Sequence, residues 1–149
     1  MEIKETVRVF VYFKQIITTL KELNNIVGNT PGYVAQELLK KGYKIIGPQI
    51  WNYDGIDGNP DSKFTLEICF PVDNISESKD PNTKYLSAFK SACLVQKGPW
   101  SELPKVYSVL IDEMGAKGYK PSNRCREVYH VCDFVNPENC ITEIQLGVQ

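Results

Sequence analysis

One short block occurs twice in the chain, and this repeat restricts the possible folds more than any other feature. Lys41-Gly42-Tyr43-Lys44 recurs 76 residues later as Lys117-Gly118-Tyr119-Lys120. The same offset, without gaps, aligns further identical residues on both sides of the block. Among them are Phe13 with Phe89, Glu37 with Glu113, Tyr53 with Tyr129, Asp57 with Asp133, and Glu67-Ile68 with Glu143-Ile144. Because an internal period indicates a fold built from similar units, we expect two matching halves, residues 1–73 and 77–149. A length of 149 residues favours a single domain that contains both halves.

Each half is expected to form a β-α-β-β unit. In the first half we expect a strand at residues 7–13, a helix at 31–41 and strands at 45–53 and 64–72. In the second half we expect the helix at 103–117 and the last two strands at 125–131 and 140–148. Gly42 and Gly118 follow the helices, where glycine suits a left-handed stop. The polar residues 74–83 are typical of a linker. The pattern predicts an α+β fold, with an antiparallel sheet, helices on one of its faces, and a central groove.

Side-chain alternation along the strands groups the residues of this groove. One face of the 64–72 strand is apolar and is expected to pack on the helices; it consists of Leu66, Ile68 and Phe70. Glu127 and Tyr129 share a face of their strand, and the repeat aligns this face with the one that carries Trp51 and Tyr53. We expect these four residues to point away from the helices and to line a groove shared by the two halves.

Glu127 is the strongest candidate for a ligand-binding residue. A carboxylate among aromatic rings is poorly hydrated unless a positive or hydrogen-bonding group meets it. A cationic aromatic ligand would supply the charge, and the rings would attract it by stacking and by cation–π contact. The alternative is a structural ion pair between Glu127 and Arg124 or Arg126.

The aromatic candidates have two interpretations each. Tyr53 and Tyr129 either hydrogen-bond a ligand or fill the core between the halves. Trp51 and Trp100 are expected to be groove walls, although Trp100 follows Pro99 and would equally cover the end of the helix. Glu67 and Glu143 occupy matching strand positions and are expected to be structural.

Composition argues against several classes of protein. The formal net charge is -1, from 17 basic and 18 acidic residues, and there is no basic stripe, so we expect no direct binding of nucleic acid. No apolar run is long enough for a membrane span, and the charged start Met-Glu-Ile-Lys-Glu does not resemble a signal peptide. We therefore expect a soluble cytoplasmic protein. Five cysteines without a Cys-x-x-Cys pair, and one histidine, predict neither a metal site nor another cofactor.

The sequence contains little that indicates nucleophilic catalysis. It has no Gly-x-Ser-x-Gly motif and no phosphate-binding loop. An acid–base role for Glu127 and Tyr129 stays open. From the residues alone, a binding protein is favoured over an enzyme.

The motifs of the second half resemble the GyrI-like small-molecule-binding domain, which also serves as the effector-binding part of AraC-type and MerR-type multidrug-sensing regulators. In order, they are Gly98-Pro99-Trp100, a helix with Leu103 and Tyr107, Gly118-Tyr119, Glu127-x-Tyr129 and Thr142-Glu143-Ile144-x-Leu146. The chain departs from the family where it has Lys97, because a histidine often precedes the Gly-Pro-aromatic turn. The first half lacks that turn and has Lys21-Glu22-Leu23-Asn24 in its place.

The resemblance implies two β-α-β-β units, related by a pseudo-two-fold axis, that bind a lipophilic and often cationic compound in a central groove. It also implies that Glu127 meets the ligand. The expected role is therefore effector binding, sensing or sequestration, with a DNA-binding regulator or a topoisomerase as a possible protein partner. Some family members hydrolyse strained alkylating compounds, so the alternative function is a hydrolase that uses Glu127 and Tyr129.

Overall fold

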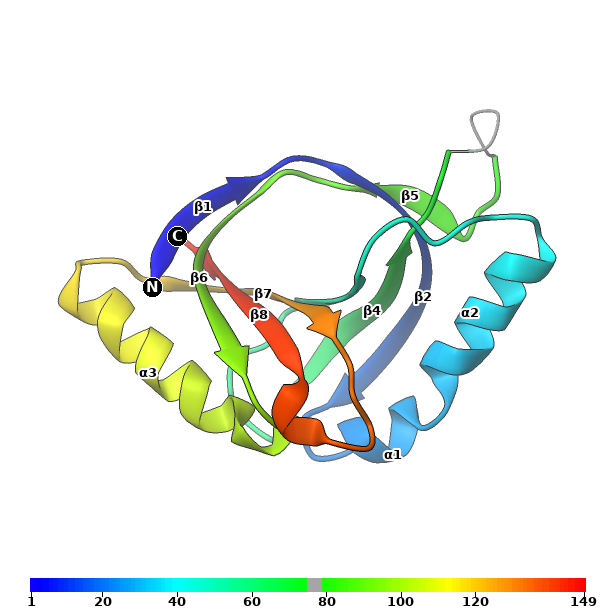
Figure 1. The fold of residues 1–149 in the computed structure, drawn as a ribbon. Coiled ribbons are helices and arrows are strands. Elements are labelled where there is room, and N and C mark those ends of the chain that lie inside the picture. The colour runs from blue at the N-terminus through cyan, green and yellow to red at the C-terminus, as the bar shows by residue number, and fades with distance from the viewer. Residues whose placement is uncertain (75–78) are drawn as a thin grey trace.

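The computed structural model describes residues 1–74 and 79–149, which form a strongly curved sheet with helices along its two sides (Figure 1). The strands are β1 (Glu2–Thr6), β2 (Val9–Thr19), β3 (Gln49–Asp54), β4 (Lys63–Pro71), β5 (Thr83–Leu86), β6 (Phe89–Lys97), β7 (Pro121–Val131) and β8 (Ile141–Val148). The helices are α1 (Leu23–Val27), α2 (Thr30–Lys40) and α3 (Leu103–Ala116), with short 3-10 turns η1 (Trp100–Glu102) and η2 (Pro137–Asn139). Each half contains the expected β-α-β-β order with one further strand before it, β1 in the first half and β5 in the second, and the α+β prediction is confirmed.

The two halves meet at the centre of the sheet, where β3 pairs with β7. The strand order is β1-β6-β8-β7-β3-β4-β2-β5, and all neighbouring strands are antiparallel. Within the β3–β7 pair, Trp51 lies directly opposite Glu127. The offset of 76 makes these same two residues equivalent, so the register has the local two-fold symmetry that the repeat predicts. Superposition of the halves over their whole length stays a prediction.

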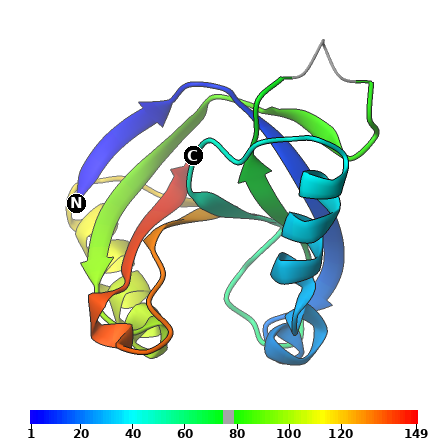
Figure 2. The same ribbon diagram turned by 45° about the vertical axis from the view of Figure 1, so that its right-hand side comes forward.

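A second pairing between the halves curls the sheet. Residues 2–6 pair with residues 93–89, and residues 9–12 pair with residues 86–83. The two ladders have the same register, as if one long antiparallel pairing were interrupted between them. Strands β1 and β2 are neighbours along the chain but lie near opposite ends of the strand order, and the sheet must bend to bring them together (Figure 2). This crossing was not anticipated, since a single strand was expected at 7–13 and a linker at 74–83. The predicted strand is present from Val9 onwards, within β2, but its start differs because strand pairing is interrupted at Val7, which is 78% exposed. Of the expected linker, residues 75–78 lie outside the described part of the chain, and Thr83 already belongs to β5.

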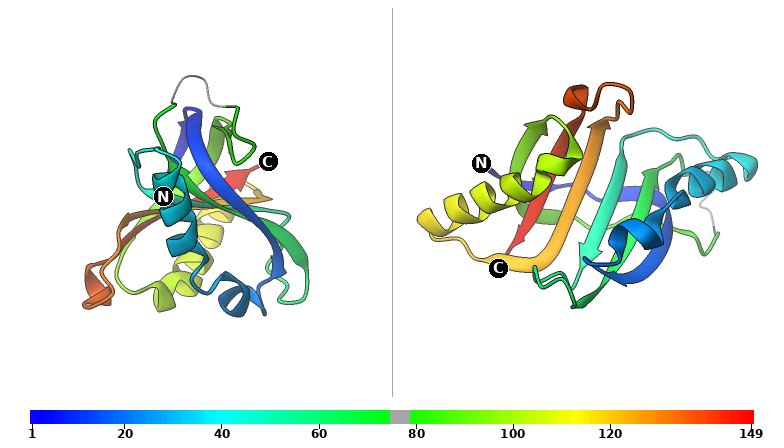
Figure 3. Two further views of the ribbon diagram at one scale, coloured as in Figure 1. Left: turned by 90° about the vertical axis from the view of Figure 1, so that its right-hand side faces the viewer. Right: turned by 90° about the horizontal axis from the view of Figure 1, so that it is seen from below.

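The helices cover one face of the sheet, here called the inner face. Helix α3 contacts β6, and helices α1 and α2 contact β2, so the central strands β8, β7, β3 and β4 lie between them (Figure 3, right). The buried helix residues form one core with inner-face strand residues; they are Val27, Val34, Leu38, Leu103, Leu110 and Met114. Gly42 and Gly118 adopt φ values of 91° and 81°, which confirms the left-handed stops after the helices. In the described residues, no helix has the length and apolar character needed to cross a membrane.

Gly147 of β8 has the tightest surroundings among the glycines of the second half. A Cβ built there would lie 2.3 Å from Ser122 Oγ and 2.9 Å from the Arg124 carbonyl oxygen. Gly147→Ala is therefore expected to lower the free energy of unfolding by about 1–3 kcal/mol, because the β7 backbone must shift. Gly115→Ala in α3 is the matched control, since nothing lies within 4 Å of the added methyl group. It is expected to raise stability by about 0.5–1 kcal/mol. Urea unfolding measures both, and an unchanged Gly147→Ala midpoint would contradict the packing described.

Candidate functional site

The strand register places the candidate residues on the inner face of the sheet. Tyr53 lies opposite Leu66 on one side and Cys125 on the other. Directly opposed residues of neighbouring strands share a face, and Leu66 belongs to the core that contains the helix residues. The same holds for Trp51, which lies between Ile68 and Glu127. The expectation that this face points away from the helices was wrong. Alternation within one strand shows which residues share a face, but only the register between strands shows which face meets the helices.

Glu127 is buried at the centre of this face and is held by tyrosine hydroxyls. Glu127 is only 5% exposed. Its Oε1 accepts a hydrogen bond from the Tyr53 hydroxyl at 2.6 Å and another from the Tyr129 hydroxyl at 3.1 Å. The ion pairs within residues 1–74 and 79–149 do not include Glu127. The carboxylate therefore has donors but no cation.

The alternative ion pair with a neighbouring arginine is wrong. Arg126 alternates to the outer face, where its Nε donates to Asn52 Oδ1 at 3.1 Å and its Nη2 to the Ser87 carbonyl oxygen at 3.1 Å. The Arg124 guanidinium lies over the Phe89 ring, 5.4 Å from the ring centroid. Neither arginine compensates the charge of Glu127.

Burial raises the pKa of the Glu127 carboxyl, and the hydroxyl groups of Tyr53, Tyr129 and Tyr107 oppose this shift by hydrogen bonding. Burial also raises the pKa of each of these tyrosines, with a further contribution from the negative charge of Glu127. The phenols are thus neutral hydrogen-bond donors at physiological pH. The carboxyl of Glu127 is the group that can change between a neutral and an ionised form when its environment changes.

Half-buried aromatic rings surround the carboxylate. Trp51 and Tyr129 meet edge to face with centroids 5.5 Å apart, and Trp100 and Tyr129 do so at 5.9 Å. Hydrogen bonds fix both indoles: Trp51 Nε1 donates to Gln49 Oε1 at 2.5 Å, and Trp100 Nε1 donates to Thr142 Oγ1 at 3.2 Å. Trp100 also begins the η1 turn that leads into α3, so it lies at the start of the helix, and its role as a groove wall stays a prediction. We call Glu127, Tyr53, Tyr129, Trp51 and Trp100 the aromatic–carboxylate cluster.

Two residues near the cluster were not among the site residues expected from the sequence. Tyr107 of α3 was named only as part of the family resemblance, but its hydroxyl lies 3.0 Å from Cys125 Sγ and its hydrogen bonding lowers the pKa of Glu127. Its position one turn after Leu103 was a signal for burial and not for polar contact. Phe134 lies in the β7–β8 turn, 5.5 Å from Trp100 between ring centroids. Tyr53 is 5% exposed, so it belongs to the core and also holds Glu127.

The outer face carries the two glutamates that were expected to be structural. Glu67 pairs with Lys84 of β5 and accepts from Asn52 Nδ2 at 2.9 Å. Glu143 pairs with Lys4 of β1 at 2.9 Å. Each glutamate therefore ties an edge strand, across one intervening strand, to the main part of the sheet.

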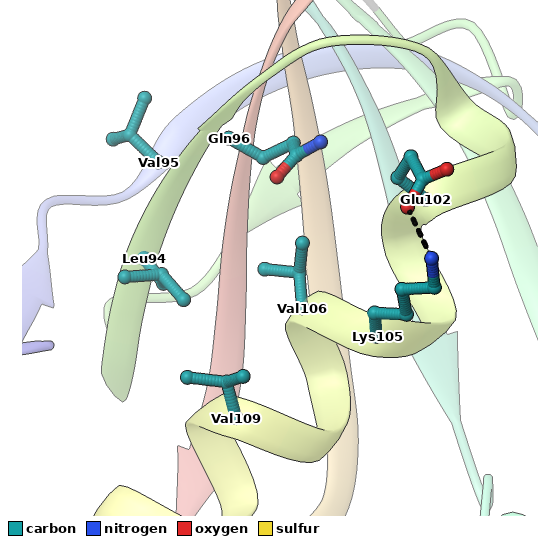
Figure 4. Close-up of a pocket in the computed structure, with 7 residues that line it drawn as sticks. All are labelled: Leu94, Val95, Gln96, Glu102, Lys105, Val106 and Val109. Atoms are coloured by element: carbon teal, nitrogen blue, oxygen red, sulfur yellow. Dashed lines mark ion pairs between the residues drawn. The ribbon is translucent and has the colours of Figure 1, made fainter.

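A surface hollow of about 310 Å³ lies between β6 and the start of α3 (Figure 4). Its lining includes Leu94, Val106 and Val109, and the ion pair between Lys105 and Glu102, at 3.0 Å, lies at its edge. The hollow contains no residue of the aromatic–carboxylate cluster, so it is a separate feature of the surface.

The raised pKa of Glu127 has a consequence for stability. Between the pKa of an unfolded glutamate, about 4.3, and the higher folded value, the folded protein binds more protons than the unfolded chain. Stability therefore falls as pH rises through this range. Glu127→Gln is expected to abolish this fall, so that the ligand-free variant becomes more stable than the wild type above the folded pKa. Each unit of pKa difference corresponds to about 1.4 kcal/mol.

Glu143→Gln is the control of opposite sign. Burial raises the pKa of Glu143, but hydrogen bonds from Lys4 and Gln145 outweigh burial and bring it below its usual range. Because of Glu143, the free energy of unfolding of the wild-type protein therefore rises as pH increases from the folded pKa of this residue towards the unfolded value of about 4.3. Urea unfolding of the three proteins between pH 3 and 8 tests both signs. A Glu127→Gln variant that is less stable than the wild type at pH 7 would show that the ionised carboxylate does not lower the free energy of unfolding.

Comparison with protein families matches residues 10–149 to the family described as "GyrI-like small molecule binding domain". A comparison with curated proteins finds no match. Among solved structures, the C-terminal domain of EcmrR has a TM-score of 0.76 at 23% identity, covering 99% of this chain and 96% of that one. In the complex of EcmrR with DNA, this chain spans 56% of the EcmrR chain.

Two more distant structures share the fold. SAV2435 bound to tetraphenylphosphonium has a TM-score of 0.68 at 12% identity, with 99% of this chain and 93% of that one covered. A hydrolase encoded by lin2189 from Listeria innocua has a TM-score of 0.53 at 13% identity, with coverage of 99% and 92%. At these identities the similarity demonstrates the fold, and the chemistry has to be argued from the residues of this chain.

Proposed function

The chain belongs to the family of GyrI-like small-molecule-binding domains, and we propose that it binds a lipophilic aromatic cation on the inner face of its sheet. The observation that carries this proposal is the buried carboxylate of Glu127, which receives hydrogen bonds from Tyr53 and Tyr129 but has no ion-pair partner in the described residues. An ionised carboxylate in such a place is costly unless a positive charge meets it. A bound cation would provide that charge.

The aromatic rings of the cluster favour a particular kind of cation. Trp51, Trp100 and Tyr129 are half-buried and fixed by hydrogen bonds and edge-to-face contacts. Aromatic faces attract organic cations whose charge is spread over a poorly hydrated surface. A small, strongly hydrated inorganic ion would lose more hydration than these rings return. Tetraphenylphosphonium, the ligand of SAV2435, is a suitable probe of this chemistry.

Binding of this kind serves effector sensing or sequestration. With a net charge of -1 and no basic stripe, this chain is not expected to contact DNA directly. A link to transcription would need a DNA-binding partner or segment, and a topoisomerase is the other class of protein partner that family resemblance suggests. The compartment proposed for this activity is the cytoplasm.

Glu127→Gln is expected to weaken tetraphenylphosphonium binding by about ten- to a hundredfold, because a charge-assisted contact is worth about 1.5–3 kcal/mol. The neutral probe triphenylphosphine oxide should lose much less, since the rings that contact it are unchanged. Binding of the cation, but not of the neutral probe, should also weaken as pH falls through the folded pKa of Glu127. Tryptophan fluorescence titration measures these affinities.

Glu143→Gln is the matched control for this experiment, because it removes a carboxylate of the same size from the outer face. Its cation affinity should stay within about twofold of the wild type, which is the usual scale of a distant substitution. Equal cation affinities for the wild type and Glu127→Gln would remove Glu127 as the counter-charge. If neither probe binds the wild type, the proposed site is wrong.

The raised pKa of Glu127 favours hydrolysis as a second candidate function. A buried carboxyl with an elevated pKa, next to tyrosine hydroxyls, has the properties of a general acid or base. If the chain is a hydrolase of strained alkylating compounds, Glu127→Gln should reduce turnover of a cyclopropane-bearing substrate by at least a hundredfold, with its fold intact by circular dichroism. A binding protein instead consumes none of this substrate over hours, and product analysis by mass spectrometry separates the two functions.

A further inference from the structure

The turn between β7 and β8 holds an exposed phenyl ring in a fixed position. Phe134 is 81% exposed. The turn around it is tied by Asp133, whose Oδ1 accepts from the backbone N–H of Val135 at 3.0 Å and of Asn136 at 2.8 Å. Asp133 Oδ2 accepts from Asn139 Nδ2 at 3.2 Å. These bonds span Phe134 on both sides, so the backbone that carries the ring is ordered although the ring faces water.

The ring of Phe134 continues the aromatic–carboxylate cluster. It meets Trp100 edge to face, with centroids 5.5 Å apart and planes at 69°. Trp100 in turn contacts Tyr129, and the Tyr129 hydroxyl donates to Glu127. A connected line of rings therefore runs from the buried carboxylate to the surface at this end of the sheet. An isolated exposed phenylalanine needs no explanation, but one that ends such a line extends the site.

The turn between β3 and β4 in the first half has a similar aspartate hydrogen bond but not the same rings. Asp57 is equivalent to Asp133, and its Oδ1 accepts from the backbone N–H of Asn59 at 2.9 Å, as Asp133 does from Val135. At the positions equivalent to Trp100 and Phe134, however, the first half has Asn24 and Gly58. The turn itself therefore does not require an aromatic residue, and the cluster extends towards the surface on one side only.

We infer that Phe134 is a further ligand-binding residue, and that the site takes a cation with several aromatic rings, one of which packs against the joint surface of Phe134 and Trp100. This inference rests on the proposed function and specifies its ligand. The charge of the ligand lies near Glu127, and its rings extend towards the β7–β8 turn. A compact cation without rings reaches the carboxylate but leaves Trp100 and Phe134 without contact.

Calorimetric titration of tetraphenylphosphonium and of ringless tetraethylammonium tests the inference. Phe134→Ala is expected to weaken tetraphenylphosphonium binding about three- to tenfold, the scale of one lost aromatic contact, and Phe134→Tyr should restore it. Val135→Ala is the matched control: it shortens the adjacent side chain, which is 86% exposed, and should leave the affinity unchanged. Tetraethylammonium should bind more weakly than tetraphenylphosphonium and should not respond to Phe134→Ala.

The outcomes separate this inference from the proposed function. If Glu127→Gln weakens tetraphenylphosphonium binding but Phe134→Ala does not, the site stands and Phe134 is not part of it. If Phe134→Ala and Val135→Ala weaken binding equally, the turn acts through its backbone and the inference is wrong. Equal affinities for the two cations would overturn the preference for aromatic rings. If the wild type binds neither cation, the proposed function fails and the inference fails with it.

Discussion

The antiparallel pairing of β3 with β7 is the constraint on which the rest of the structure depends. It is the contact that joins the two halves at the centre of the sheet, and its register sets Trp51 opposite Glu127 and Tyr53 opposite Cys125. A slip by one residue would turn Glu127 to the outer face and bring Arg126 to the inner one. The burial of the carboxylate, its hydrogen bonds to Tyr53 and Tyr129, and the position of the indole beside it all follow from this one register.

The same register creates an energetic conflict at the centre of the molecule. Hydrophobic packing of Tyr53, Leu66 and Ile144 favours closure of the inner face, whereas the Glu127 carboxylate favours water or a cation. Phenol hydroxyls reduce this cost but cannot remove it, because a neutral donor solvates a charge only in part. On the outer face the conflict is resolved within the chain, since Glu67 and Glu143 each have a lysine. Glu127 has no such partner among the described residues, although the fold supplies one to each outer-face glutamate, and this is the reason to look for an external cation.

Local sequence signals predicted the elements of this fold well, and long-range signals predicted its assembly less well. The stops at Gly42 and Gly118 and the order of strands and helices follow from backbone preferences that act over a few residues. The repeat predicted a two-fold relation between the halves, and the β3–β7 register has this symmetry locally. The pairings of β1 with β6 and of β2 with β5 were missed because they join residues 71 to 91 positions apart in the chain, and neither β1 nor β5 is strongly apolar. The face of Glu127 was assigned wrongly for a related reason. Side-chain alternation shows which residues of a strand share a face, but the register between strands is needed to know which face meets the helices. Tyr107 shows a further limit: helical periodicity predicts that a side chain is buried, but not which polar group its hydroxyl meets.

The difference between Trp51 and Glu127 explains why a site of this kind needs two unequal halves. The register brings two equivalent positions face to face, at a spacing where side chains interact directly. Two glutamates there would repel each other, and one would become protonated, so a single cation would meet no more charge than one carboxylate provides. Two tryptophans would provide aromatic surface but no charge. With one of each, a single ligand can meet a carboxylate and an aromatic face across the same pair of strands. The divergence of Asn24 from Trp100 and of Gly58 from Phe134 continues this asymmetry outwards, so that the approximate symmetry of the fold defines the position of the site and the departures from it define what the site binds.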